Sequence, residues 1–217
     1  MNNIKKNNYF YAFILMMTII CSAIVFAIFF KPLYYLDLNW LNIKEMTNLS
    51  IEQIKTNYNQ LIQYQSIFYK GPLILSNFIM SNSGAKHFQE VKVIFESIQV
   101  VMGVGIIISG IIIYYKIKEL DFMFFKISGL MCVLVPTCIG LIVSINFNQA
   151  FIIFHQIIFR NNNWIFDERY DPVITILPEA FFMHCFVLIV ILVLISSCVL
   201  LLIYKKMYRR ILKEIDK

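Results

Sequence analysis

Charged residues are scarce in this sequence. Only 15% of its 217 residues are Asp, Glu, Lys or Arg, whereas 59% are apolar, and the mean hydropathy is +0.72. In soluble globular domains about a quarter of the residues are charged. The deficit excludes an ordinary soluble domain and predicts an integral membrane protein.

Acidic residues are fewer than basic ones, 13 against 19, which leaves a net charge of +6. A basic balance can indicate a nucleic-acid partner. Here the surplus gathers beside the apolar runs rather than on a polar domain, as the positive-inside rule requires of membrane proteins. We therefore expect the lipid bilayer, and no nucleic acid, as a partner.

Signatures of a nucleophile are also missing. All five cysteines lie inside apolar runs, where Cys behaves as a small hydrophobic residue, and none has metal-ligand spacing with its neighbours. No G-x-S-x-G sequence marks a nucleophilic serine. The sequence therefore implies neither a disulfide framework nor a serine hydrolase.

Four apolar runs approach the roughly 20 residues that a helix needs to cross the bilayer. They cover about 10–30, 98–115, 127–145 and 181–204. The second is the shortest and begins within a longer helical pattern that starts near Ala85. The first has too long an apolar core for a signal peptide and lacks a small-x-small cleavage site, so we interpret it as an anchor.

Basic residues gather at the two ends of the chain and in the turn between the second and third runs. Both termini are therefore expected to be cytoplasmic. Segments 31–96 and 146–180 then face outward and form a small extracellular helical cap. We predict an all-α membrane protein with a single membrane domain over 1–217. The basic residues behind this orientation are Lys5, Lys6, Lys116, Lys118, Lys126, Lys205, Lys206, Arg209, Arg210, Lys213 and Lys217.

The first outer segment carries local helix signals. Ser50 followed by Gln53 is typical of a capping box, and apolar residues recur at helical spacing to about Phe68. Further along, Lys86 and Glu90 are spaced to pair at i, i+4 on the helix that leads into the second span. An amphipathic helix and a cap-to-membrane helix are predicted.

Two of the three histidines are predicted at the outer interface. His87 begins the cap-to-membrane helix, with Glu90 on the same face and close enough to orient its ring, and His155 follows the third span. Two histidines at one depth favour general acid–base chemistry over isolated interfacial residues. His184, inside the fourth span, is expected to bond the backbone of a neighbouring helix.

The second outer segment, 160–172, is the densest polar cluster and is flanked by Trp164 and Tyr170. Asp171 followed by proline is typical of a helix N-cap with proline at N1. The alternative is that its polar residues only cap helices and hold the loop. A metal site built from His87, His155, Asp167 and Glu179 is weakly supported, because no local ligand pair accompanies it; we expect no metal and no cofactor.

Two motifs resemble a known family over nearly the whole chain. The shorter motif is His87-Phe-Gln-Glu-Val-Lys92; the longer is His155-x-x-x-Phe159-x-Asn161-x-x-Trp164-x-Phe166-Asp167-x-x-x-Asp171-x-x-Ile174-x-x-x-Pro178-Glu179-x-Phe181-Phe182. They are similar to the bacterial lipoprotein intramolecular transacylase family. The chain departs from it mildly, with Glu168 where the family usually has proline and Glu90 where Asp is common.

The resemblance implies an enzyme of the bacterial cytoplasmic membrane that acts on diacylated lipoproteins. It would move the sn-2 acyl chain to the α-amine of the N-terminal cysteine, giving the lyso form, with His87 and His155 as catalytic acid and base. Arg160, Arg169 or Asn161 would stabilise the oxyanion. Candidate residues that bind substrate or support the site are Glu90, Lys92, Arg160, Asn161, Trp164, Asp167, Asp171 and Glu179.

Two other classes of function remain open. One is a non-enzymatic membrane protein, either a transporter subunit or a ligand-binding sensor, which would gather its polar groups near the bilayer midplane. The other is an intermolecular acyltransferase or lipid hydrolase that uses the same histidines. The sequence does not determine the oligomeric state.

Overall fold

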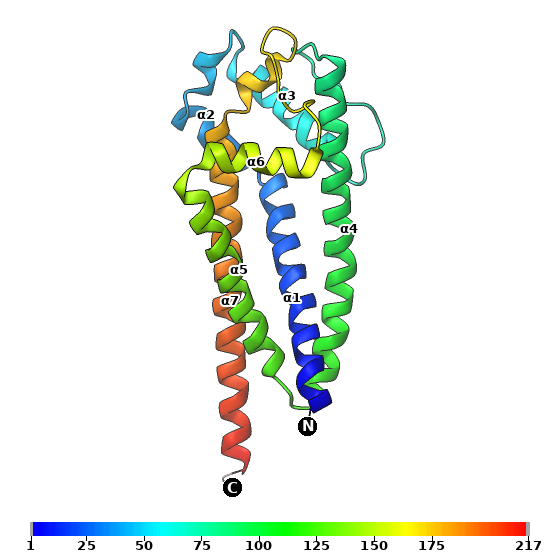
Figure 1. Cartoon of the computed structure of the whole chain (residues 1–217), viewed down its shortest axis with the longest axis vertical. Coiled ribbons are helices and arrows are strands. Elements are labelled where there is room, and N and C mark those ends of the chain that lie inside the picture. Colours follow the sequence, from blue (N-terminus) through cyan, green and yellow to red (C-terminus); the bar gives the residue numbers. More distant parts are fainter. Residues whose placement is uncertain (1, 216–217) are drawn as a thin grey trace. The chain divides into compact units, whose positions relative to one another are not determined.

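The computed structural model describes the backbone of residues 2–215 and the side chains of residues 8–213. All regular secondary structure in this range is helical (Figure 1). The side chains of Lys5, Lys6 and Lys217, part of the predicted charge pattern, lie outside the described side chains. The elements are α1 (Asn2–Phe29), α2 (Lys31–Trp40), η1 (Ile43–Met46), α3 (Ile51–Tyr64), α4 (Asn82–Lys118), α5 (Met123–Ile145), α6 (Phe147–Phe159), η2 (Pro172–Ile176) and α7 (Glu179–Ile215).

Within the described residues, four helices are long and apolar enough to cross a membrane: Asn8–Phe29, Asn82–Lys118, Met123–Ile145 and Glu179–Lys213. The four apolar runs expected from the sequence fall on these helices, which confirms the all-α fold. The second and fourth are longer than their apolar runs, because polar turns continue the helix at the start of α4 and at the end of α7. Both are unbroken in Figure 1.

The chain divides into two compact units. The first comprises Met1–Ile24, Gln99–Ile142 and Leu188–Lys217, and the second comprises Val25–Ile98 and Val143–Val187. Every candidate site residue named above belongs to the second unit. The single membrane domain expected over 1–217 stays a prediction.

Neutral polar contacts join the helices of the first unit. The hydroxyls of Thr18 and Ser109 lie 3.2 Å apart, and Ser197 donates to the carbonyl of Gly129 at 2.7 Å. A Cβ on Gly105 would lie 2.4 Å from Thr18 Oγ1, so glycine permits the close approach of α1 and α4. Small residues and hydroxyls are the usual means of packing helices in lipid. These contacts build a scaffold and carry no charge, unlike the midplane sites of many transporters.

An aromatic core holds the second unit together. The ring of Tyr34 on α2 stacks on that of Tyr58 on α3 at 3.6 Å, and Phe181 of α7 meets both edge-on. Tyr34 also donates its hydroxyl to the carbonyl of Ile176 in η2 at 2.8 Å. Buried aromatic pairs of this geometry add stability beyond their buried area. The core therefore fixes α2, α3, η2 and the start of α7 as one body.

Two local predictions for this unit have different outcomes. The capping box of α3 is confirmed: Ser50 Oγ accepts from Gln53 N at 3.2 Å, and Gln53 Oε1 accepts from Ser50 N at 2.9 Å. The helix ends at Tyr64, earlier than the expected Phe68, because the following backbone carbonyls turn toward the ammonium of Lys92.

Candidate active site

His87 and His155 come together in the second unit. His87 lies in the second turn of α4 and His155 in the middle of α6, and their ring centroids are 5.8 Å apart. Both side chains are buried, with exposed fractions of 6% and 9%. The sequence predicted that the two histidines lie at the same depth, and in the structure their rings are close neighbours.

The tautomer of His155 follows from a contact within its own helix. Its Nδ1 lies 2.8 Å from the carbonyl oxygen of Phe151, one turn earlier. A carbonyl only accepts, so Nδ1 carries the hydrogen and, in the neutral ring, Nε2 keeps a free lone pair. Burial lowers the pKa of His155, against a smaller opposite effect of the Phe151 carbonyl. At neutral pH the ring is uncharged and able to accept a proton at Nε2.

His87 lacks such a partner. Its Nδ1 is buried and makes no hydrogen bond with any residue that the structure describes. The ring meets Phe159 at 4.6 Å and Phe166 at 5.5 Å, both close to edge-on. The protein therefore fixes the plane of the His87 ring through aromatic packing but leaves its tautomer open.

Aromatic side chains also line His155. The centroids of Phe151, Trp164 and Phe159 lie 4.1, 4.9 and 5.4 Å from that of its ring. This aromatic surround, Phe151, Phe159, Trp164 and Phe166, places apolar rings beside two titratable rings that are little exposed to solvent. Such a site suits an apolar substrate with a polar reacting group.

Glu90, Asn161 and Trp164 link the loop after α6 to α4. Asn161 donates from Nδ2 to Glu90 Oε1 at 3.0 Å, and Trp164 donates from Nε1 to the Asn161 carbonyl at 2.8 Å. Arg160, in the left-handed region at φ 54°, ends α6 and turns the chain so that Asn161 reaches Glu90. The expectation that Glu90 orients the His87 ring is wrong, since Glu90 Oε1 accepts from Asn161, and neither Glu90 Oε2 nor His87 Nδ1 has a hydrogen-bond partner among the described residues. The expected pair of Glu90 with Lys86 is also not found among the described side chains.

Asp171 was expected to cap the helix that follows it and does not. Its buried carboxylate accepts from Ser81 N at 2.8 Å and from Ser81 Oγ at 2.6 Å, and Ser81 Oγ accepts from Gly84 N at 3.0 Å. A short 3-10 helix, η2, follows Asp171 without a side-chain cap. The carboxylate instead stabilises the positive N-terminal end of α4, the helix that carries His87.

Asp167 and Glu179 have hydrogen-bond partners other than the two histidines. Arg169 donates to both carboxylate oxygens of Asp167, at 2.6 and 3.0 Å for the shortest contacts, and this holds the pKa of Asp167 down at about 2. Asn148 donates to Glu179 at 2.6 Å. The four ligands of the metal alternative are thus not gathered, and in the described range no three His, Cys, Asp or Glu side chains form a metal-binding group.

The three candidate oxyanion donors, Arg160, Arg169 and Asn161, differ in whether their side chains are already engaged in hydrogen bonds. Arg169 is engaged by Asp167, and the amide of Asn161 is engaged by Glu90 and by the Phe159 carbonyl. The side chain of Arg160 is exposed and makes no hydrogen bond or ion pair with the side chains that are described. Of the three, Arg160 keeps a free guanidinium.

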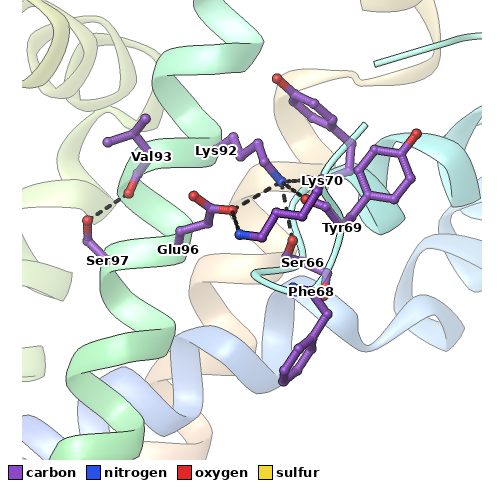
Figure 2. Close-up of polar contacts among 9 residues, drawn as sticks. Ser66, Phe68, Tyr69, Lys70, Lys92, Val93, Glu96 and Ser97 are labelled. Carbon is purple, nitrogen blue, oxygen red and sulfur yellow. Dashed lines mark hydrogen bonds and ion pairs between the residues drawn. The ribbon is translucent and has the colours of Figure 1, made fainter. Parts of the chain in front are cut away.

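Lys92 holds a turn rather than facing the histidines. Figure 2 shows its ammonium among backbone carbonyls of the turn that follows α3. It donates to the carbonyls of Tyr64, Ser66 and Tyr69, the last two at 3.2 Å, and pairs with Glu96 at 3.3 Å. Lys92 therefore ties the turn after α3 to α4 and supports the site from outside.

The contact between His184 and Asp37 was not predicted from the sequence. His184 was expected to bond the backbone of a neighbouring helix, and this is wrong. Its Nδ1 lies 2.8 Å from Oδ1 of Asp37, a fully buried carboxylate on α2. Burial raises the pKa of Asp37, with His184 acting in the opposite sense. No local pattern marks Asp37, because its partner is 147 positions away in the chain.

A family model described as lipoprotein intramolecular transacylase Lit matches residues 9–182 of the chain. Among solved structures, the membrane integral lipoprotein intramolecular transacylase Lit from Bacillus cereus is 32% identical, covering 97% of this chain and 98% of that chain with a TM-score of 0.93. Two structures of the same relative, each with one histidine replaced, are 31% identical. Their TM-scores are 0.88 and 0.87, with coverage of 100% and 96% of this chain and 96% of each relative. No curated protein matches the sequence.

Proposed function

The chain belongs to the lipoprotein intramolecular transacylase family, and we propose that it moves the sn-2 acyl chain of a diacylglyceryl lipoprotein to the α-amine of that lipoprotein's N-terminal cysteine. Family membership makes it an acyltransferase and a multi-pass integral membrane protein. The product would be a lyso-form lipoprotein with one ester-linked and one amide-linked chain.

The reaction balances without a cofactor. The amine nitrogen attacks the ester carbonyl, a C–N bond forms, and the bond from the acyl carbon to the glycerol oxygen breaks. One proton leaves the nitrogen and one reaches the released hydroxyl. The cyclic intermediate is a medium ring, which free chains close reluctantly, so the enzyme must fold its substrate.

The observation that carries the proposal is the buried pair of histidines. His155 is neutral and has its lone pair at Nε2, so we assign it as the base that removes the proton from the attacking amine. His87, whose tautomer the protein leaves open, accepts that proton at one ring nitrogen and donates the proton on its other nitrogen to the glycerol oxygen, so that both rings end the reaction neutral. The aromatic surround binds the acyl chains beside them. Arg160, with its free guanidinium, is the proposed oxyanion donor.

Replacing each histidine tests the assignment. His87→Ala and His155→Ala are expected to lower the yield of lyso-form lipopeptide by about 10²- to 10⁴-fold, the usual contribution of a general acid or base. Lys86→Ala and Gln156→Ala, at exposed neighbours on the same helices, are the matched controls. Wild-type rates in both histidine variants, at equal membrane abundance, would refute the assignment.

A crossover experiment separates the proposed reaction from the enzymatic alternatives. Two diacylated lipopeptides, one with deuterated acyl chains and a distinct peptide, are mixed with the purified protein without phospholipid. Intramolecular transfer leaves every product at the mass of its substrate, with one chain moved to nitrogen in the fragment spectrum. Crossed masses would indicate an intermolecular enzyme, and loss of a chain would indicate a hydrolase.

We further propose the bacterial cytoplasmic membrane as the location, with both termini in the cytoplasm and segments 31–96 and 146–180 outside. The charge asymmetry of the connecting segments supports this orientation. Single cysteines introduced at exposed Phe68 and Leu120, in a background without native cysteines, test it. An impermeant maleimide added to whole cells is expected to label the first and not the second; the reverse pattern would overturn it.

A further inference from the structure

Two polar atoms on one face of α4 are buried without a partner among the described residues: His87 Nδ1 and Glu90 Oε2. Their spacing of i, i+3 makes the two side chains neighbours on the helix. Folded proteins leave few buried polar atoms unpaired, and each one calls for a specific explanation. A carboxylate oxygen beside a proposed acid–base pair is not explained by helix stability.

The other oxygen of Glu90 is fully used. Its Oε1 accepts from Asn161 Nδ2 at 3.0 Å and from Asn163 Nδ2 at 3.5 Å. Asn161 is itself fixed, since its Oδ1 accepts from Asn163 N at 2.9 Å and its carbonyl accepts from Trp164. The carboxylate is therefore held by its Oε1, whereas Oε2 is buried without a partner among the described residues.

An ionised carboxylate only accepts hydrogen bonds, so the group that meets Oε2 must be a donor. A cationic donor satisfies it best, because charge-assisted hydrogen bonds are roughly twice as strong as neutral ones. The nearest lysines along α4 do not fill this role. Lys92 is occupied by three carbonyls and Glu96, and Lys86 is exposed.

We propose that Glu90 Oε2 binds the α-ammonium group of the substrate's N-terminal cysteine and selects substrates whose amine is free. The proposal rests on the function proposed above. The ammonium group has three N–H bonds: one points to Glu90, and another to Nε2 of His155, which Trp164 and Asn161 connect to Glu90. A lipoprotein already acylated on nitrogen has neither the charge nor the spare N–H bonds, so Glu90 discriminates against it.

Two inert ligands test the proposal on the purified protein. Both are diacylated lipopeptides with ether-linked chains, which cannot be transferred; one has the α-amine and the other lacks it. Wild-type protein is expected to bind the amine-bearing analogue about 10- to 100-fold more tightly, the effect of one hydrogen bond to a charged group. Equal affinities would overturn the proposal without any variant.

Substitutions test whether Glu90 is responsible for the tighter binding of the amine-bearing analogue. Glu90→Gln keeps an acceptor for Asn161 and is expected to bring the affinity ratio close to one, whereas Glu90→Asp retains most of it. Glu96→Gln, at another acid of the same helix, is the control and keeps the wild-type ratio. A wild-type ratio in a folded Glu90→Gln protein would refute the role. The crossover assay tests the proposed function independently of these affinities. If that function is wrong, wild-type protein makes no lyso-form product in the crossover assay.

Discussion

The carboxylate of Asp171 accepts both the backbone N–H and the hydroxyl of Ser81, 90 positions earlier in the chain. Ser81 in turn caps α4 through the N–H of Gly84. The contact lies about a turn and a half before His87. A residue in the second polar segment thus determines where the helix of the first histidine begins.

Asp171→Asn is expected to destabilise the protein by about 1–3 kcal/mol, since an amide supplies only one acceptor and leaves a buried donor unpaired. The midpoint of thermal unfolding in detergent measures this, and the rate of lyso-form production is expected to fall with it. Asp167→Asn, at an exposed ion pair that solvent screens, is expected to change stability much less. Equal effects of the two substitutions would contradict the capping role.

Gly84→Ala is expected to disrupt the same contact. A Cβ at this position would lie 2.2 Å from Asp171 Oδ1, so the carboxylate must move and the protein loses about 1–3 kcal/mol. Gly103→Ala, on the same helix with nothing within 4 Å of the added Cβ, is the matched control. It is expected to be neutral or stabilising by up to about 1 kcal/mol. Unfolding midpoints that fall equally for both variants would show that the Asp171 contact is not responsible.

The lowered pKa of His155 predicts a pH dependence of stability. As the pH falls below the ordinary histidine pKa of about 6.5, the unfolded chain binds a proton there and the folded protein does not, so the free energy of unfolding decreases. Above that pH this contribution is fully present. Wild-type protein is expected to lose more stability between about pH 7 and pH 5 than His155→Gln. A parallel loss in both proteins would place the pKa of His155 at its ordinary value.

Lys92→Met is expected to release the turn after α3. The backbone carbonyls at Tyr64, Ser66 and Tyr69 lose their common donor, and amide hydrogen exchange over 64–70 is expected to rise. Lys55→Met removes a pair with the exposed Glu52 at 3.7 Å and a contact with the ring of Tyr35, neither of which involves the turn, and is expected to leave exchange there unchanged. Unchanged exchange in Lys92→Met would mean that the turn is held by other contacts.

Features set by neighbours in the chain were predictable. The four spans follow from local hydropathy, and the capping box of Ser50 and Gln53 depends on residues three positions apart. The proximity of His87 and His155 was also accessible, because each could be assigned a depth from the end of its apolar run. Their catalytic roles remain predictions.

Contacts between distant segments were not predictable. Asp37 meets His184 across 147 positions, and Asp171 meets Ser81 across 90, with no periodicity that relates them. Asp171 followed by proline matched a local cap, but tertiary packing gave its carboxylate a better partner. The role of Lys92 was hidden for another reason: its partners are backbone carbonyls, which every residue has, so no residue type signals the site.

The hydrogen bond from His155 Nδ1 to the carbonyl of Phe151 is confined to five consecutive residues. In a Ser-His-Asp triad a carboxylate from a distant segment sets the tautomer of the base; here the helix backbone does so, and a carbonyl is present whatever side chain stands at 151. The side chain at position 151 can therefore vary with the length or branching of the acyl chains. The backbone hydrogen bond that sets the tautomer of His155 does not depend on that side chain.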